Sequence, residues 1–425
     1  MNVGAHIRFP HLRWNSIAFL IDYATFGAAF ALVSVETVVP SLADQLTGSA
    51  LVIGLVSTVF NAAWLLPQLA VAHAIKDKPS KKPYILPGII GRGVALLLVT
   101  LALWLGLTRH PVAMLGAIFL YLALFAVSDG VVAVSWFDIL ARTVPVKSRG
   151  RLLGIGQALS GLAGVGAGVL IGRILGAPGI SFPTNYALLF TVAAVLLVPS
   201  SVAIMLLRES PSEPVAQDGE AAEKGNWFKL LADDRAFRRV IICRILVAMV
   251  GLTSPFYVVH ASAVLRLPSQ IIGAFVVAQT LGGLIASLAF GSLAARKGPL
   301  IVIRIGSALA ALGPLLALLA DLAGGGLMAI AYPAVFVASG AANSIWTLGF
   351  FNYVLEIAPD DLRPVYVGAG NTIMGIMTLR TVFGGWLLGS TSYAALFAVT
   401  IALVGAGFLM ALTLKPSTAV TADDP

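Results

Sequence analysis

Three carboxylates lie inside long apolar segments of this sequence, namely Asp22, Glu36 and Asp129. A charge in such a segment is costly and is by default a functional candidate. Burial in a low-dielectric cavity disfavours the ionised form of a carboxylic acid, so the group can take up and release a proton. Asp129 is the leading candidate, because the polar Ser135 and the aromatic Trp136 lie within two helical turns of it. We interpret Asp129 as a proton-coupling or substrate-binding acid. A structural pairing with a nearby basic side chain stays open.

Arginines interrupt four of the apolar segments: Arg244 and Arg380, and also Arg92 and Arg304. Glu36 and Arg380 have similar depth, which makes them candidates for a salt bridge near one end of the spans. Asp22 and Arg244 have similar depth near the other end and are candidates for a second gate. An arginine whose charged end snorkels to the interface explains these positions equally well. The other two arginines are interpreted as snorkelling structural residues.

Four more side chains in the apolar segments are candidates for ligand contact: Asn61, Trp64, Asn343 and Trp346. Packing between helices is an alternative role for each. The sequence has no phosphate-cradling Gly-x-x-x-x-Gly-Lys motif, and its five histidines show no metal-ligand spacing. Cys243 is the only cysteine. We therefore expect no cofactor and no metal.

The composition places most of the chain in a lipid environment. Hydrophobic residues make up 59% and charged residues 11% of the chain, against about a quarter charged in a soluble domain. The apolar segments lack the alternation of barrel strands, and helices are the other structure that satisfies its backbone in a bilayer. We predict an all-α membrane protein with twelve transmembrane helices. The segments are 15–39, 50–75, 84–107, 112–136, 152–175, 185–207, 240–259, 270–294, 300–320, 328–352, 365–388 and 393–414.

The second half of the sequence repeats positions of the first half. Pro145, Arg149, Gly154, Gln157 and Gly161 recur at one constant spacing as Pro359, Arg363, Gly368, Asn371 and Gly375. In the same register, Asp129 and Asp138 match Asn343 and Asn352. The repeat predicts two similar six-helix halves in parallel orientation. The expected domains are residues 1–207, a cytoplasmic linker at 208–239, and residues 240–425 with a short cytoplasmic tail.

Lysine and arginine concentrate in alternate loops. If the N-terminus is inside, 20 of the 27 basic residues fall on the cytoplasmic side. This asymmetry predicts a multi-pass protein of the cytoplasmic membrane with both termini in the cytoplasm. The net charge of +8 is then a topology signal, and we expect no nucleic-acid partner.

Short loop motifs resemble those of the major facilitator superfamily of secondary transporters. The loop after the second span has an acid and three bases, although both glycines of the family pattern are replaced. The loop after the eighth span has the complementary glycines and a base, and the segment 145–157 matches the pattern between helices four and five. The matching residues are Asp77, Lys78, Lys81, Lys82, Gly291, Arg296, Gly298, Pro145, Arg149 and Gly150.

The resemblance implies a fold, a cycle and a role for these loops. It implies two bundles that hold a small molecule near the bilayer midplane and expose it to each side in turn, with protons as a candidate coupling ion and a monomer as the working unit. It also implies cytoplasmic contacts that latch one state, and it assigns to them Asp77, Lys78, Lys81, Lys82, Asp138, Arg149, Arg296 and Arg363. Asp138 is expected to pair with Lys78 or Arg149. A role as topology markers alone stays open for the bases.

The direction of transport and two other functions stay open. Gly164, Gly168 and Gly172 resemble the glycine signature of antiporters and favour export, although small residues at this spacing permit close packing in any membrane protein. The apolar spans favour an amphipathic or drug-like solute. One alternative is an integral-membrane enzyme that acts on a lipid-linked substrate. Such an enzyme needs a cluster of acidic residues at one face, whereas the acids of this sequence are dispersed. The other is a non-transporting receptor or scaffold, which a flux measurement distinguishes.

The charge asymmetry generates a test of topology. In a chain without Cys243, cysteines placed at Ser80 and Ser148 are expected to react with a membrane-impermeant thiol reagent only from the cytoplasmic side. The measurement is labelling in intact cells and again after the cells are opened. Labelling of either position in intact cells would overturn the predicted orientation.

Overall fold

The described residues of the chain are helical, as the apolar segments predict. The computed structural model describes residues 9–75, 78, 80–209, 227–323, 331–359 and 362–416, and within these ranges it contains helices and no strand. Eleven helices are long and apolar enough to cross a membrane, and the apolar stretch Ala50–Leu65 adds a shorter one. These helices overlap the twelve predicted segments, with ends that differ by several residues, and residues 328–330 of the tenth segment lie outside the described residues. The all-α, polytopic prediction is confirmed.

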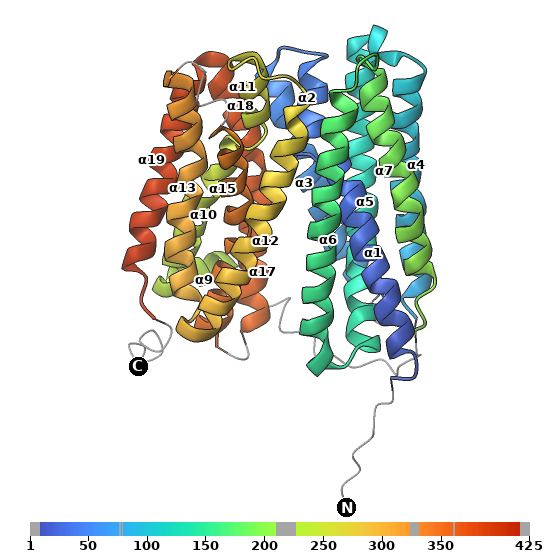
Figure 1. Cartoon of the computed structure of the whole chain (residues 1–425). Coiled ribbons are helices and arrows are strands. Elements are labelled where there is room, and N and C mark those ends of the chain that lie inside the picture. The colour runs from blue at the N-terminus through green and yellow to red at the C-terminus, as the bar shows by residue number, and fades with distance from the viewer. Residues whose placement is uncertain are drawn as a thin grey trace, which may run out of the picture. The chain divides into compact units, whose positions relative to one another are not determined.

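The chain divides into two compact units (Figure 1). The first unit contains Met1–Val33, Ala62–Ala167 and Gly179–Ala216, and the second contains Ser34–Asn61, Gly168–Pro178 and Gln217–Pro425. Two segments from the first half of the sequence, 34–61 and 168–178, thus pack with the helices of the second half. The division at 208–239, which rests on the sequence repeat, stays a prediction.

The first unit is a bundle in which α4 packs on α5 and α1 packs on α7. Its core contains Phe19, Ile85, Trp136 and Ile204. Association of helices in lipid depends on close packing, since the lipid is as apolar as the side chains. The helices are α1 (Leu12–Leu32), α4 (Lys82–Trp104), η1 (Leu107–Arg109), α5 (Pro111–Thr143) and α7 (Thr184–Met205), with parts of α3 (Ala50–Ile75) and α6 (Val146–Leu175).

The second unit contains more interrupted helices. Its core gathers Phe237, Ile303, Phe350 and Val404 from four of them. The helices are α2 (Val38–Asp44), α9 (Trp227–Asp233), α10 (Arg235–Ala248), η2 (Met249–Leu252), α11 (Phe256–Ala263), α12 (Ile271–Lys297), α13 (Pro299–Ala323), α15 (Pro333–Asn343), η3 (Trp346–Phe351), α16 (Asn352–Ile357), α17 (Arg363–Ile376), η4 (Met377–Leu379), α18 (Arg380–Ser390) and α19 (Tyr393–Thr413).

Several spans of the second unit are broken in the middle. The seventh span changes from α10 through the 3-10 turn η2 to α11, and Pro255 stands immediately before α11. The tenth span contains the π-helical segment η3, and the eleventh span contains the turn η4. At such breaks some backbone N–H and C=O groups lack their regular α-helical hydrogen bonds. Breaks of this kind are common at functional sites.

The seventh span begins earlier than the sequence predicts. Asp234 accepts a hydrogen bond from the backbone N–H of Phe237 (2.9 Å) and so caps α10 at Arg235, five positions before the predicted start at Val240. An acid that bonds the free N–H groups of the first turn stabilises a helix start. The end of the predicted linker is therefore helical, in α9 and the first turn of α10.

Two glycines of α12 make a matched test of helix packing. A Cβ at Gly282 would overlap the carbonyl group of Val337 in α15, whereas a Cβ at Gly291 would meet nothing within 4 Å. Overpacking of this kind costs about 1–3 kcal/mol. Gly282→Ala is expected to lower the melting temperature of the purified protein in detergent, and Gly291→Ala is expected to leave it unchanged or raised. Equal melting temperatures for the two variants would contradict the close α12–α15 contact.

Candidate functional site

Asp129 lies in a buried polar cluster of the first unit. Nη1 of Arg92 in α4 is 3.2 Å from its Oδ1, and Nε1 of Trp64 in α3 donates to its Oδ2 over 3.1 Å. The Arg92 side chain is 2% exposed and that of Asp129 is 16% exposed. Asp129 is therefore the member of this ion pair that a solute or water reaches.

A second carboxylate joins the same cluster through a serine. Nη2 of Arg92 donates to Oγ of Ser200 in α7 (3.3 Å), and Oγ of Ser200 donates to Oδ1 of Asp22 in α1 (2.6 Å). The indole N–H of Trp136 donates to the other oxygen of Asp22 (3.0 Å). Five helices of the first unit thus contribute to one set of contacts, called here the Asp–Arg–Asp network: Asp22, Trp64, Arg92, Asp129, Trp136 and Ser200.

The network contains two carboxyl groups and one guanidinium group. If both carboxyls are ionised, one negative charge remains without a matching cation. Burial makes an uncompensated charge expensive. The arrangement therefore favours the binding of one more positive charge, either as a proton on a carboxyl or as a cationic group of a solute.

Glycines allow the helices that carry the network to approach closely. A Cβ at Gly88 or Gly91 of α4 would overlap the Ser128 region of α5, and a Cβ at Gly130 would lie 2.5 Å from the carbonyl oxygen of Trp64. Gly130 follows Asp129 directly, so the same residue that lets α3 approach α5 brings the Trp64 indole to the Asp129 carboxylate. The Arg92 guanidinium also lies over the Phe26 ring of α1, 5.2 Å from its centroid, a favourable cation–π arrangement.

One interpretation of the sequence needs correction here. Arg92 is no snorkelling residue, because it is buried and paired with Asp129. Asp22 has Ser200 and Trp136 as its hydrogen-bond partners. Its expected gate with Arg244, a residue of the other unit, stays a prediction. Sequence reasoning missed Ser200 entirely, and its only signal is a hydroxyl in a long apolar span. Arg304 is structural, as predicted: its guanidinium donates to carbonyl groups at the end of α19.

Glu36 and Arg380 are both in the second unit but do not form the expected salt bridge among the described contacts. Glu36 accepts a hydrogen bond from the side-chain amide of Gln279 in α12. Nη1 of Arg380 donates to the carbonyl of Met377 (2.8 Å), and Nε of Arg380 and Nε of Arg244 are buried without a hydrogen-bond partner in the described structure. Both guanidinium groups thus retain unused donors.

A second contact joins the segment 34–61 to the broken eleventh span. Oγ1 of Thr58 in α3 donates to the carbonyl of Thr378 in η4 (3.1 Å) and touches Oγ1 of Thr381 in α18. A Cβ at Gly385 of α18 would lie 3.0 Å or less from the backbone of Ala50. Together with the Glu36–Gln279 bond, these polar contacts hold segments of the two sequence halves together within one unit.

The remaining ligand candidates have local contacts. Asn61 donates to the carbonyl of Ser57 (2.7 Å), one turn earlier in α3. Trp346 stacks on Phe350 within η3, with ring centroids 5.7 Å apart. Asn343 is exposed at the end of α15. The structure thus brings Trp64 to Asp129, and it gives Asn61 and Trp346 partners on their own spans.

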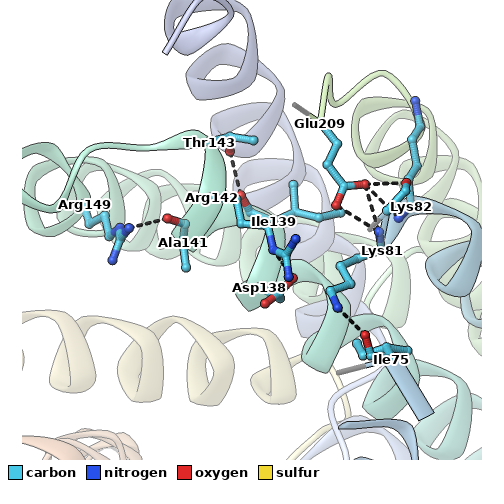
Figure 2. A network of polar contacts seen from close by, with 11 residues as sticks. Ile75, Lys81, Lys82, Asp138, Ile139, Ala141, Arg142, Thr143, Arg149 and Glu209 are labelled. Carbon is cyan, nitrogen blue, oxygen red and sulfur yellow. Dashed lines mark hydrogen bonds and ion pairs between the residues drawn. The ribbon is translucent and has the colours of Figure 1, made fainter. Parts of the chain in front are cut away.

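Several loop residues assigned to a latch form contacts inside the first unit (Figure 2). Asp138 pairs with Arg142 of the same helix (2.7 Å), which corrects the expected pairing with Lys78 or Arg149. Arg149 donates to the carbonyls of Val144 (2.9 Å) and Ala141. It therefore caps the C-terminal end of α5, a favourable position for a cation.

Glu209 makes contacts at the start of α4 that the sequence analysis missed. Its carboxylate accepts hydrogen bonds from the backbone N–H groups of Lys81 (2.9 Å) and Lys82 (3.2 Å) and from the hydroxyl of Ser80 (2.7 Å), as Figure 2 shows for the two lysines. An acid at this place satisfies the free N–H groups at the start of α4. Glu209 begins the segment that the composition assigns to a linker, so no local pattern connects it with residues 80–82.

The other latch residues differ in whether their side chains form hydrogen bonds. Lys82 donates to the carbonyl of Leu207 (3.0 Å), and Nζ of Lys81 bonds the carbonyl of Ile75. Nε of Arg363 donates to the carbonyl of Leu355 (3.2 Å). Lys78 and Arg296 are exposed, and Asp77 lies outside the described residues. Across the described part of the chain, no group of three or more His, Cys, Asp or Glu side chains is arranged to hold a metal ion.

The comparison with protein families decides the class of this protein. The family model described as Major Facilitator Superfamily matches residues 21–380. The chain belongs to the major facilitator superfamily. It is accordingly an integral membrane protein and a secondary transporter, and the enzyme alternative is set aside. No curated protein sequence matches the chain.

Solved transporter structures share this fold at low sequence identity. A bacterial homologue of the iron transporter ferroportin in an inward-facing state is 15% identical, with a TM-score of 0.72 over 95% of this chain and 99% of that one. A D-xylose–proton symporter is 13% identical, with a TM-score of 0.72 over 96% and 99%. A POT family transporter in complex with 5-aminolevulinic acid is 11% identical, with a TM-score of 0.70 over 95% of each chain.

The Asp–Arg–Asp network generates a stability test. Removing one partner of a buried ion pair typically costs about 3–5 kcal/mol, because the other charge stays buried alone. Arg92→Met is expected to lower the free energy of unfolding by this amount at neutral pH, and Asp129→Asn in the same chain is expected to restore part of it. The measurement is denaturant titration of the purified protein in detergent.

Arg304→Met is the matched control for this test, because Arg304 contacts carbonyl groups and no carboxylate among the described residues. It is expected to cost less, and adding Asp129→Asn to it is expected to bring no recovery. Additive effects of Arg92→Met and Asp129→Asn would contradict a direct interaction between the two side chains.

Proposed function

We propose that this transporter couples the movement of a small solute to a proton that binds the Asp–Arg–Asp network at Asp129. The observation that carries the proposal is the charge count: Asp22 and Asp129 share the single guanidinium of Arg92. One proton makes the network neutral, and its release restores a net negative charge. In the ion pair of Arg92 and Asp129, the Asp129 side chain is the more exposed of the two. This exposure supports Asp129 as the group that exchanges the proton.

The proposed step changes the contacts of three helices. When Asp129 takes up a proton, its ion pair with Arg92 in α4 is lost and the hydrogen bond from Trp64 in α3 weakens, because a neutral carboxyl is a poorer acceptor. Arg92 keeps its link to Asp22 through Ser200. The proton thus alters the packing of α3 and α4 on α5 without leaving the guanidinium unpaired. A cationic solute group that approaches Asp129 competes for the same place as the proton.

We propose that the Glu36–Gln279 and Thr58–Thr381 contacts close the outer path. They join segments from both sequence halves, and the distribution of basic residues puts them toward the outer side. On the cytoplasmic side, the residues assigned to the latch by family resemblance would close the alternate state: Asp77, Lys78, Lys81, Lys82, Asp138, Arg149, Arg296 and Arg363.

We propose the cytoplasmic membrane as the location, with both termini inside and a monomer as the working unit.

The class of solute and the direction of transport are proposed from the apolar spans and from the glycines of α6. The structures named above include a homologue of an iron transporter, a D-xylose–proton symporter and a transporter in complex with 5-aminolevulinic acid, so fold likeness does not select a substrate. The apolar spans support an amphipathic solute, and the glycines of α6 support export. Gly168 and Gly172 also lie against Gly273 of α12, so close packing accounts for the same glycines.

Asp129→Asn tests the coupling. A screen for ligand-induced thermal stabilisation first identifies a solute, and flux is then measured in proteoliposomes with and without a pH gradient. The variant is expected to fold, because the second half carries Asn343 at the matching position. It is expected to keep exchange and downhill flux and to lose accumulation driven by the gradient, since Asn cannot bind and release a proton.

Asp138→Asn is the matched control, because it removes a carboxylate from the same helix outside the network. Its flux is expected to keep the dependence on the pH gradient even if the rate changes. Accumulation by Asp129→Asn with the wild-type dependence on the gradient would eliminate Asp129 as the coupling residue.

A further inference from the structure

A second buried polar cluster lies in the second unit, on the outer half of the broken seventh span. His260 in α11 is fully buried. Its Nδ1 is 2.9 Å from the hydroxyl of Tyr332, and its Nε2 is 3.1 Å from Oδ1 of Asp321 in α13. The Tyr332 hydroxyl in turn donates to the backbone carbonyl of Tyr257 (3.0 Å). None of these residues belongs to the Asp–Arg–Asp network.

The contacts of Tyr332 determine which nitrogen of His260 carries a hydrogen. A tyrosine hydroxyl has one hydrogen, and a carbonyl oxygen only accepts. Both contacts of the Tyr332 hydroxyl are hydrogen bonds at once only if it donates to Tyr257 and accepts from Nδ1 of His260. Nδ1 of His260 therefore carries a hydrogen.

The contact with Asp321 then requires one further proton. With Nδ1 protonated, Nε2 of a neutral imidazole has a lone pair directed at the Asp321 oxygen, and two acceptors do not form a hydrogen bond. The bond forms if Nε2 is protonated and Asp321 is ionised. It forms equally if Asp321 is protonated and donates to a neutral imidazole. In both cases the pair holds one dissociable proton and has no net charge.

Asp321 is the member of the pair that a pocket reaches. Asp321 is 19% exposed and lines a pocket of about 850 Å³, together with Ser49, Trp386 and Tyr393. His260 lies behind it, against the rings of Tyr393 and Phe397, with centroids 4.9 Å and 5.3 Å away. A proton that enters from the pocket therefore meets Asp321 first.

We propose that His260 and Asp321 together bind one proton from this pocket, and that the proton holds α11 against α13. Its release leaves a carboxylate facing the lone pair of Nε2 and an unpaired negative charge inside the protein, so the contact between the two helices is lost. The other titratable groups around the pair are Tyr257, Tyr332, Tyr393 of α19, and Asp44 of α2, which accepts from Ser262 of α11 (3.4 Å). The site is separate from Asp129, and its test needs no transport assay.

The first test compares the stability of two variants over a range of pH. If the proton holds α11 against α13, the wild type loses this contact when the pH rises past the point of release, so its stability falls there. Asn at position 321 donates a permanent hydrogen to Nε2 and cannot lose it. Asp321→Asn is therefore expected to fold and to lose this falling step in the melting temperature, measured in detergent.

Asp44→Asn is the control, because it removes a neighbouring carboxylate that is bonded to the same helix but not to His260. It is expected to keep the step. Persistence of the step in Asp321→Asn, or its loss in Asp44→Asn, would overturn the proposal.

The second test observes the hydrogens of His260 directly. The protein is labelled with ¹⁵N in histidine, and the resonances that shift in Asp321→Asn identify His260 among the five histidines. Nδ1 is expected to carry a hydrogen throughout the pH range in which the protein is folded. A neutral imidazole with its hydrogen on Nε2 alone would show that Tyr332 donates to Nδ1, and would overturn the proposal.

Discussion

A charge inside a bilayer must be compensated within the protein, and in the first unit one guanidinium group meets this requirement for two carboxylates. Arg92 contacts Asp129 directly and Asp22 through Ser200. Because these residues come from four helices, the position of each helix affects the compensation of the others. Loss of the cation leaves two buried acids, whereas gain of a proton makes the network neutral. The same arrangement that stabilises the bundle therefore also makes it sensitive to proton binding.

The closeness of the helices depends on glycine at a few contact points. Gly88 and Gly91 bring α4 to α5, and Gly130 brings α3 to α5 beside Asp129. In lipid there is little hydrophobic drive for helices to associate, so close backbone approach and polar contacts supply the attraction. Small residues next to the polar ones thus determine which side chains meet. The solved transporter structures named above share the fold at 11% to 15% identity.

The two polar clusters differ in how they handle charge. The network around Arg92 has more acids than bases and gains by taking up a positive charge. The pair of His260 and Asp321 is neutral with one proton and acquires a negative charge when the proton leaves. Both have a more exposed carboxyl in front of a buried basic group, at 16% for Asp129 and 19% for Asp321. In both proposals the exposed carboxyl exchanges the proton with water, and the buried base keeps its partners.

The sequence by itself determined the membrane environment, the helical class and the apolar spans, and it singled out Asp129 as a candidate. Apolar length and the cost of unpaired backbone groups in lipid act locally, so these features are visible in any window of about 20 residues. The contact partners of the polar residues were not visible in the sequence in this way. Arg92 and Asp129 are far apart in the sequence, and snorkelling accounts for an arginine in a span as readily as pairing does. Ser200 and Glu209 carry no motif, and only the folded chain brings them to Asp22 and to the start of α4. The tertiary structure decided these contacts because each depends on which faces of separate helices meet, and that is set by packing over the whole unit.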